Sequence, residues 1–287
     1  TGSSGFLASH IVDTLVRNGI EVQLFDSQPS PYKNNDQNEL VGNLLNETDL
    51  RKAMQGCDLV YHFAAQADIE ASSLNPAETI ESNIMGTLNV LEIAKDIGVK
   101  RLLFASTIYV YSGHLGSFYR VSKQSCEKII EEYYREFGLK YTILRYGSLY
   151  GPRANEFNAI RRFIFQALKD KKIVRQGNGE ELREYIHVKD AAQLSFDALN
   201  EKFINKHLII SGNQQIKIKE LLIMIKEILN NKIEIKYVKS NKLYHYEITP
   251  YNYRPQVAKK VTSNSYYDLG QGIMDQIYEF DTSLVKK

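Results

Sequence analysis

Two pairs of residues that could do proton chemistry stand near the middle of the 287-residue chain. Ser106 and Thr107 end an apolar run, and Tyr119 and Lys123 follow, separated by four positions. Residues four apart share one face of a helix, so the phenol and the ammonium are expected to lie within reach of each other. A nearby lysine cation stabilises phenolate and lowers the pKa of tyrosine, which makes Tyr119 a candidate general base near neutral pH. Because the chain has 19 tyrosines, a tyrosine four residues before a lysine is expected by chance. This pair is informative because it follows a strand and a Ser-Thr pair.

A glycine-rich turn opens the sequence and leads directly into a helical pattern of apolar residues. Gly2 and Gly5 stand in GSSGFLA, where glycine lets the backbone approach a pyrophosphate that the free N–H groups of the helix N-terminus stabilise. Asp26 ends the next strand pattern, where an acid can bind the adenine ribose hydroxyls, although a plain strand-end aspartate is the alternative. Because an acid there repels a 2′-phosphate, the sequence favours NAD over NADP.

Helical and strand patterns alternate through the first half of the chain, which predicts an α/β fold. Helices are expected over 6–18, 47–54, 77–96 and 118–137, and strands over 20–25, 59–63, 101–106 and 139–146. This rhythm is typical of a Rossmann doubly wound parallel sheet with helices on both faces. The strand that such a fold needs before the glycine turn is not in the given sequence, so we expect a fragment or a trimmed sequence.

The rhythm loosens after Gly151, where a smaller and interrupted substrate lobe is expected. The expected elements there are helices over 157–169, 189–199, 218–229 and 271–279, strands over 206–210 and 232–237, and a loop over 176–185. We expect a dinucleotide-binding domain of residues 1–147 plus about 187–212. Residues of about 148–186 plus 213–287 are expected to form the substrate-binding lobe.

Composition and charge exclude several classes of function. The formal charge of +2 arises from 36 basic and 34 acidic residues without a basic block, so nucleic acid is not an expected partner. Cys57 and Cys126 form no CxxC or Cys/His cluster, which argues against disulfides and a metal site and fits a reducing compartment. No apolar run approaches 18 residues and no signal peptide is recognisable, so we expect no membrane association and a cytoplasmic location.

Several longer motifs, in order along the chain, resemble the extended short-chain dehydrogenase/reductase family. They are TGSSGFLASH (1–10), HFAAQ (62–66), NPAETIESNIMGTLNVLE (75–92), FASTIYVY (104–111), YRVSK (119–123), LRYGSLYGPR (144–153) and GNGEELREYIHVKDAA (177–192). Within that family the resemblance is to the NAD-dependent epimerases and dehydratases of nucleotide sugars, in particular the UDP-galactose/UDP-glucose 4-epimerases.

The resemblance implies a set of cofactor-binding residues. Pyrophosphate contacts fall on Gly2, Gly5, Phe6 and Leu7, the ribose contact on Asp26, the adenine contacts on Asn43 and Leu44, and the remaining cofactor contacts on Ala64, Ala65, Gln66, Tyr119 and Lys123. Family members often have Asp where Asn43 stands.

A second set of residues is expected at the substrate. Thr107 and Tyr119 would contact the sugar hydroxyl that is oxidised, and with Lys123 they are the candidate catalytic residues. Asn83 is a further candidate in the helix, or an ordinary surface residue. The other expected substrate contacts are Ser148, where the family commonly has Asn, and two arginines for the diphosphate, Arg183 and, more weakly, Arg254. A surface salt bridge is the alternative for Arg183.

The departures from the family pattern narrow the expected reaction. Thr107 is followed by Ile108 and Tyr109, where sugar 4,6-dehydratases carry an acidic pair that eliminates water, and the segment between Thr107 and Tyr119 is short. We therefore expect a 4-epimerase of a nucleotide sugar, with a UDP-hexose favoured, that works through a transient ketone. The alternatives are an NAD-dependent dehydrogenase or reductase of a nucleotide sugar or small alcohol, and a non-catalytic nucleotide-binding module.

A homodimer is also expected, through the helices at 77–96 and 118–137. Ile129 and Tyr133 would lie exposed at such an interface, or would be ordinary core.

Overall fold

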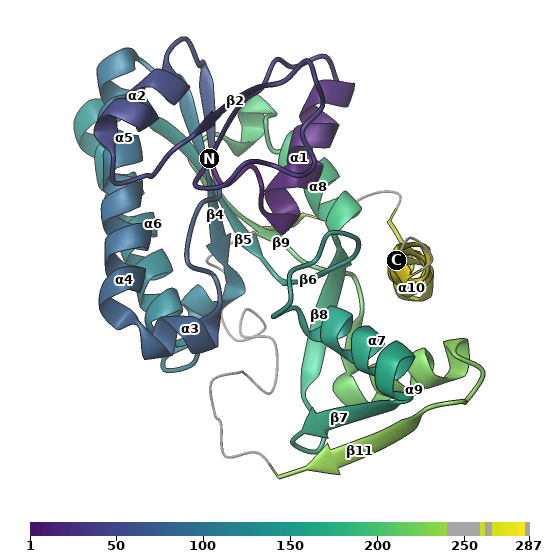
Figure 1. Ribbon diagram of the computed structural model, residues 1–287. Coiled ribbons are helices and arrows are strands. Elements are labelled where there is room, and N and C mark those ends of the chain that lie inside the picture. Colours follow the sequence, from purple (N-terminus) through teal and green to yellow (C-terminus); the bar gives the residue numbers. More distant parts are fainter. Residues whose placement is uncertain (240–258, 262–265, 285–287) are drawn as a thin grey trace.

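A parallel sheet organises the larger part of the molecule, which we call the sheet lobe (Figure 1). The computed structural model describes residues 1–239, 259–261 and 266–284. Five parallel strands lie in the order β12-β9-β5-β4-β3. They are β3 (Leu59–His62), β4 (Arg101–Thr107), β5 (Lys140–Tyr146), β9 (Lys206–Ile210) and β12 (Lys259–Val261). A parallel pair, β1 (Gln23–Asp26) with β2 (Asn38–Val41), lies beyond β3.

The first two residues join these two groups of strands. The amino group of Thr1 donates a hydrogen bond to the carbonyl of Tyr61 (2.7 Å). The N–H of Gly2 donates to the carbonyl of Phe25 (2.8 Å), and the N–H of Phe63 donates to the carbonyl of Thr1 (3.1 Å). The glycine turn is therefore held directly above the ends of β1 and β3.

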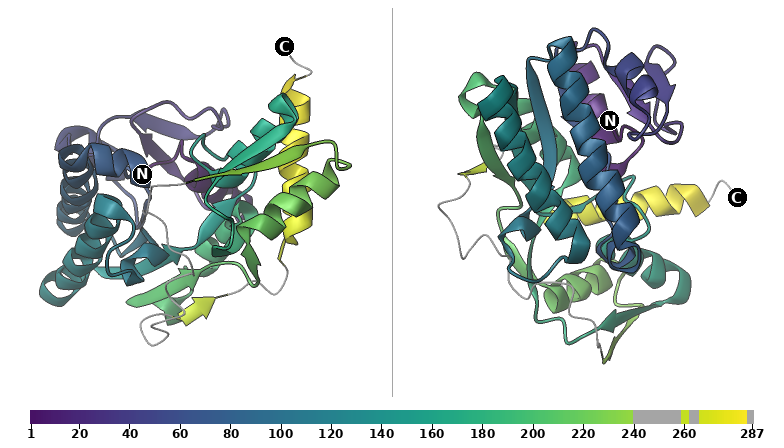
Figure 2. Two further views of the ribbon diagram at one scale, coloured as in Figure 1. Left: turned by 90° about the horizontal axis from the view of Figure 1, so that it is seen from below. Right: turned by 90° about the vertical axis from the view of Figure 1, so that its left-hand side faces the viewer.

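Helices cover both faces of the sheet, as Figures 1 and 2 show. One face carries α2 (Glu47–Met54), α5 (Gly86–Ile97) and α6 (Ser117–Phe137), and the other carries α1 (Phe6–Arg17) and α8 (Val188–Asp197). Side chains of β4 alternate between the two cores: Leu102 and Phe104 pack beneath α2, α5 and α6, whereas Leu103 packs beneath α1 and α8. The predicted α/β fold with a parallel sheet between helical layers is confirmed.

The remaining elements form a smaller outer lobe below the sheet in Figure 1. Its strands are β6 (Ser148–Tyr150), β7 (Lys172–Gln176), β8 (Leu182–His187), β10 (Gln215–Lys217) and β11 (Glu234–Val238), and its helices are α7 (Ala159–Asp170), α9 (Ile218–Ile228) and α10 (Leu269–Leu284). Strand β8 pairs with β6 in parallel and with β10 antiparallel, and β7 pairs with β11. Phe163, Ile164, Leu221, Leu222 and Ile225 lie in its core.

Arg153 connects the two lobes. Its guanidinium forms an ion pair with Asp13 of α1 (2.8 Å) and lies over the ring of Tyr32. Its backbone N–H donates to the carboxylate of Glu279 in α10 (3.0 Å). Arg153 adopts a positive φ of 62°, a conformation that is uncommon for a residue with a side chain.

Several predicted elements were wrong in detail. The single helix expected over 77–96 is α4 (Pro76–Ile80), a π-helical turn (Glu81–Met85) and α5. The expected loop over 176–185 contains most of β8. Two buried positions of this strand are occupied by Arg183 and Glu184, so the sequence lacks the apolar alternation typical of a strand. Glu184 is satisfied by hydrogen bonds from Ser211, Gln215 and Lys260, which its sequence neighbourhood does not reveal. The short elements α3 (Ile69–Leu74), η2 (Ile108–Tyr111) and η3 (Glu201–Phe203) complete the described chain.

The long helices α5 and α6 lie side by side on the outside of the sheet lobe (Figure 2). Of the two α6 residues considered for an interface, Tyr133 is buried and Ile129 is half-buried against the same core. Both side chains therefore belong to the core of the sheet lobe, which is the alternative to an interface role. Among the described residues, no helix combines the length and the apolar character needed to cross a bilayer.

Buried histidines make the stability of this fold depend on pH. Burial lowers the pKa of His10 to about 4 and that of His187 to about 4. In the unfolded chain both histidines take up a proton near pH 6.5, whereas in the folded protein they do so only near pH 4. Acid therefore favours the unfolded state. We expect the free energy of unfolding to be unaffected by these groups above pH 6.5. Between pH 6.5 and 4 it should fall by roughly 1.4 kcal/mol per pH unit for each histidine.

Urea unfolding at several pH values measures this slope, and a His10→Gln variant isolates one contribution. The ring nitrogen Nε2 of His10 bonds the carbonyl of Pro152 (3.0 Å), a contact that a glutamine amide can replace. An identical slope in the variant and the native protein would contradict the assignment.

Candidate active site

The glycine turn forms a cradle at the carboxyl ends of the strands, between β1 and β3. Gly2 has a φ of 75°, and a Cβ placed on it would lie 2.5 Å from the backbone nitrogen of Ala64, so this position accepts no side chain without moving the backbone. Gly5 precedes α1 and has no side chain to cap the first N–H groups of the helix. These groups remain directed at the space above the turn, which is the arrangement that binds a pyrophosphate.

Asp26 lies beside this turn. One carboxylate oxygen accepts a hydrogen bond from the backbone N–H of Ser4 (2.9 Å) and the other accepts one from the N–H of Gln28 (3.2 Å). The exposed Asn43 follows β2 and caps its own turn by accepting from the N–H of Leu45 (2.9 Å). The side chain of Leu44 packs into the core against Gly86, so only its main chain can contribute to a contact with adenine, which stays a prediction.

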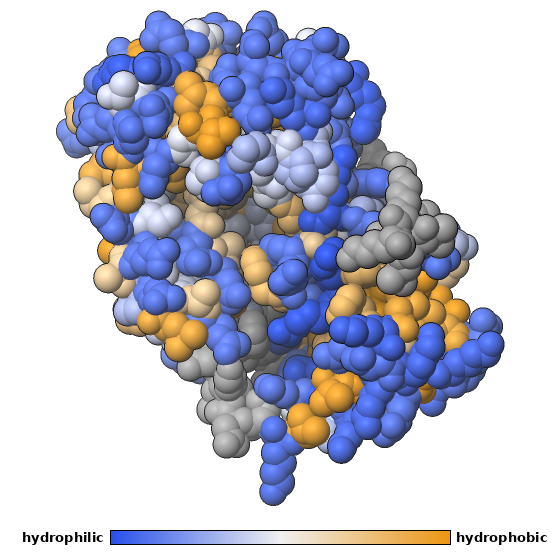
Figure 3. All heavy atoms as spheres, in the orientation of Figure 1, coloured by the Kyte–Doolittle hydropathy of each residue, from blue (hydrophilic) through white to orange (hydrophobic). Residues whose placement is uncertain are grey.

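A cavity of about 600 Å³ lies between the sheet lobe and the outer lobe, where the surface in Figure 3 is hollowed. The predicted site residues that line it are Gly2, Gly5, Phe6, Leu7, Ala65, Gln66, Thr107, Tyr119, Lys123, Ser148 and Arg183. Those that lie outside its lining are Asp26, Asn43, Leu44, Ala64 and Asn83. Arg254 falls outside the described residues.

The candidate catalytic residues meet at one end of this cavity. Thr107 ends β4, and its hydroxyl forms a hydrogen bond with the phenol of Tyr119 at the start of α6. Lys123, one turn further along α6, donates a hydrogen bond to the backbone carbonyl of Ala105 (2.7 Å) and lies over the ring of Phe104. The threonine, the tyrosine and the lysine are therefore fixed against the same strand end.

The pKa of Tyr119 departs from the expectation. Burial raises the pKa of Tyr119 to about 12, and the hydrogen bond with Thr107 opposes this shift only partly. Lys123 is directed at the Ala105 carbonyl, and burial lowers the pKa of its ammonium to about 8. The expected lowering of the phenol pKa was therefore wrong for this structure, because desolvation outweighs the hydrogen bond from Thr107.

Asn83 is hydrogen-bonded to a residue of the cavity wall. Its amide oxygen accepts from the backbone N–H of Gln66 (2.7 Å), and its amide nitrogen donates to the Gln66 carbonyl (3.1 Å) and to the hydroxyl of Ser122 (2.9 Å). The side chain is buried in the π-helical turn. Asn83 therefore holds the segment after β3 in place and has no free polar group for a substrate.

Basic side chains distinguish the far end of the cavity. Arg162 of α7, Arg175 of β7 and Arg183 of β8 line it, whereas no Asp or Glu is found among the described lining residues. Arg175 pairs with Glu181 (2.8 Å) just outside the lining. We did not predict Arg162 or Arg175. The alternation of β7, with Ile173 buried on the same side as Arg175, is the signal that could have placed Arg175 inward.

Comparison with known proteins defines the class to which this site belongs. Residues 1–210 match the model of the NAD-dependent epimerase/dehydratase family. The chain belongs to that family of enzymes, which act on nucleotide sugars, and its cofactor is NAD.

Individual relatives differ in their reactions. The chain is 32% identical to a putative UDP-glucose 4-epimerase of Methanocaldococcus jannaschii, over 79% of this chain and 80% of the relative. It is 30% identical to a UDP-N-acetyl-α-D-glucosaminuronate decarboxylase of Bacillus cytotoxicus, over 90% and 88% of the two chains. The crystal structure of UDP-glucose 4-epimerase from Thermotoga maritima with UDP-glucose superposes with a TM-score of 0.85 at 26% identity, covering 99% of this chain and 98% of that one.

Proposed function

We propose that this enzyme is a 4-epimerase of a UDP-hexose, which oxidises the sugar hydroxyl to a ketone and then reduces the ketone on its other face. The supporting observation is the hydrogen-bonded Thr107–Tyr119 pair, which lies in a cavity whose described lining includes no carboxylate. Such a site offers one proton-transfer centre and lacks the acid and base that the elimination of water requires.

The residues around the glycine turn fit NAD. The Gly2–Gly5 cradle and the N-terminus of α1 suit the pyrophosphate, and Asp26 suits the adenosine ribose. When bound, NAD supplies reversible hydride transfer. In this proposal Asn83 acts as a positioning residue, because its amide holds the main chain of Gln66 along the cofactor side of the cavity.

The protein's own part in the reaction is to move one proton and to hold the sugar. Tyr119 as phenolate removes the proton from the hydroxyl at carbon 4 and returns it to the same oxygen when the carbon is reduced. Thr107 donates its hydrogen bond to the phenolate and thereby stabilises that form. Lys123, charged below about pH 8, adds a positive charge one helical turn away. Arg183, together with Arg162, is placed to neutralise the diphosphate at the far end of the cavity.

Decarboxylation of a UDP-uronate is a second candidate function. Oxidation at carbon 4 of a hexuronate creates a β-keto acid, which loses its carboxylate as CO₂ and leaves an enolate. The enolate takes up a proton from water at carbon 5, and the ketone at carbon 4 is then reduced. The excess of arginines in the cavity suits a substrate with one more negative charge, and a decarboxylase is among the relatives that cover most of the chain.

Product analysis separates these reactions. We expect the protein to interconvert UDP-glucose and UDP-galactose without any change in the absorbance of free NADH, because the hydride returns to the sugar. Release of CO₂ and a UDP-pentose from UDP-glucuronate would favour the second candidate. Steady consumption of free NADH would indicate a simple reductase. The absence of turnover with every nucleotide sugar would contradict the proposed function.

Two further features belong to the same proposal. We place cofactor binding in the sheet lobe and substrate binding in the outer lobe, and we retain a homodimer formed through the outer faces of α5 and α6. Light scattering in solution measures the mass that tests the dimer.

A further inference from the structure

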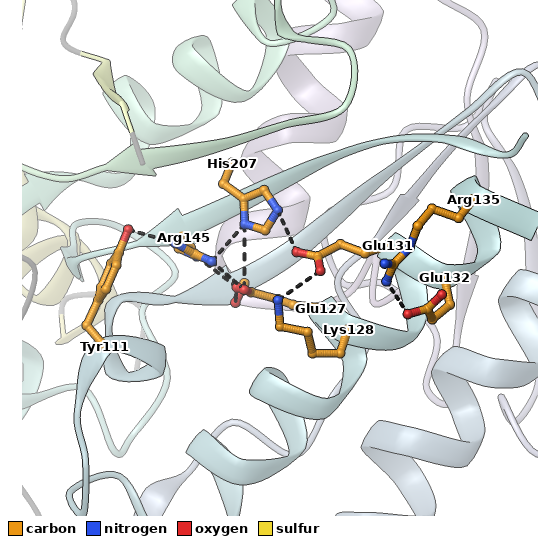
Figure 4. Close-up of polar contacts among 9 residues, drawn as sticks. Tyr111, Glu127, Lys128, Glu131, Glu132, Arg135, Arg145 and His207 are labelled. Carbon is orange, nitrogen blue, oxygen red and sulfur yellow. Dashed lines mark hydrogen bonds and ion pairs between the residues drawn. The ribbon is translucent and has the colours of Figure 1, made fainter. Parts of the chain in front are cut away.

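A buried ion pair joins α6 to β5, one helical turn after Lys123 (Figure 4). Glu127 of α6 and Arg145 of β5 are each about 95% buried and meet at 2.5 Å. Glu127 also accepts a hydrogen bond from the Nε of Arg145 (2.9 Å) and one from the hydroxyl of Ser106 (2.5 Å). The carboxylate thus joins α6 to the ends of two neighbouring strands.

The same ion pair reaches the chain on the other side of Thr107. The Nη1 of Arg145 donates a hydrogen bond to the phenol oxygen of Tyr111 (2.7 Å), and the guanidinium lies over the Tyr111 ring (4.8 Å). Tyr111 ends the 3₁₀ turn that begins directly after Thr107. The segment Ser106–Tyr111, which carries Thr107, is therefore held at both ends by Glu127 and Arg145.

The outer side of the ion pair is closed by a histidine. The Nη2 of Arg145 donates to the Nδ1 of His207 (2.7 Å), and the Nε2 of His207 faces the carboxylate of Glu131 (3.1 Å). Because Nδ1 accepts a hydrogen bond, the neutral ring carries its proton on Nε2 and donates it to Glu131. Each of the three guanidinium nitrogens of Arg145 thus donates a hydrogen bond to a described residue.

We propose that Glu127 and Arg145 are positioning residues that set the place of Thr107 relative to Tyr119. Tyr119, Lys123 and Glu127 follow one another at intervals of four along α6, so the helix that presents the phenol is also the helix that holds Ser106–Tyr111. An ion pair that served stability alone would not need to bond both ends of the segment that carries Thr107. The inference rests on the proposed function for its kinetic test, and on the structure alone for its second test.

The kinetic test removes both charges together. A Glu127→Gln change alone leaves a buried cation without its partner and is expected to destabilise the fold strongly. In the double variant E127Q/R145M no charge is left unpaired, and replacement of a buried ion pair by neutral groups is often tolerated. We expect this variant to fold with a melting temperature close to that of the native protein. Its kcat should be about 100-fold lower and its KM within about twofold, because a displacement of about 1 Å costs that much in rate.

A milder variant allows the same test if the double variant fails to fold. Tyr111→Phe removes one attachment and leaves the ion pair intact, and we expect about a tenfold loss of kcat with unchanged melting. Lys128→Ala is the matched control, because Lys128 pairs with Glu131 on the exposed side of α6 (2.8 Å) and does not contact the Glu127–Arg145 pair. Its kcat should be that of the native protein.

Amide hydrogen exchange of peptides covering residues 105–111 provides the second test, independent of turnover. Exchange should accelerate in E127Q/R145M and Tyr111→Phe and remain native in Lys128→Ala. If exchange accelerates but even the native protein turns over no nucleotide sugar, the proposed function fails and the positioning role stands. Native kcat and native exchange in folded variants would overturn the inference.

Discussion

Replacement of Tyr119 by phenylalanine is expected to reduce kcat by about 10³-fold while NAD remains bound. The substitution removes the only oxygen with which this side chain accepts the sugar proton, and it leaves the ring that fills the cavity wall. Tyr134→Phe is the matched control on the same helix, because the Tyr134 ring packs on Tyr141 away from the cavity. Turnover of UDP-galactose and the NAD released on denaturation measure the two parts of the expectation.

The pH dependence of the native enzyme tests the same assignment. Tyr119, with a pKa of about 12, must lose its proton, whereas Lys123, with a pKa of about 8, must keep its own. Below pH 8 the phenolate fraction rises about tenfold per pH unit while the ammonium stays charged. Above pH 8 the gain of phenolate is balanced by the loss of ammonium. We therefore expect kcat to rise up to about pH 8 and then to level. A flat profile from pH 6 to 8 would count against Tyr119 as the base.

The second large effect is expected at Gly2. A Gly2→Ala substitution combines a positive φ of 75° with a Cβ that would lie 2.5 Å from the backbone nitrogen of Ala64 and 2.8 Å from the backbone carbon of Phe63. Because both neighbours are backbone atoms, the turn itself must move, and its N–H groups move away from the pyrophosphate. The loss of one or two hydrogen bonds to a charged group weakens NAD binding by about 10- to 100-fold or more.

Two glycines provide controls for this variant. Gly19 has the same φ of 75° but open space around its Cβ position, so Gly19→Ala measures the cost of the backbone conformation alone. Gly5→Ala adds a methyl group in the turn itself, 3.1 Å from the Gly2 carbonyl oxygen and without a positive φ. We expect NAD content, measured on the purified proteins, to fall most in Gly2→Ala and to stay native in Gly19→Ala. Equal NAD content in Gly2→Ala and Gly19→Ala would refute the steric explanation.

Much of the sheet lobe could be predicted because its signals are local. Strands β4 and β5 are recognised by their apolar runs, and the pairing of Tyr119 with Lys123 follows from helix geometry. Both signals lie within a few neighbouring residues. These local signals predict that Thr107, Tyr119 and Lys123 lie together, and the structure brings all three to the same cavity.

What escaped prediction depends on contacts between distant segments. Glu184 can be buried in β8 beside Arg183 because residues after β9 donate hydrogen bonds to its carboxylate. The sequence around Glu184 does not indicate these partners. Asn83 was expected at the substrate, yet its amide bonds the main chain of Gln66, 17 positions earlier. Similarly, the phenol pKa of Tyr119 is set mainly by its burial. The extent of this burial cannot be predicted from the spacing of residues along a helix.

The joint formed by Arg153 has a mechanical consequence. It ties α1, whose N-terminus faces the dinucleotide cradle, to α10 of the outer lobe through Asp13 and Glu279. Any change in the angle between the two lobes must therefore break one of these contacts or carry α1 with it.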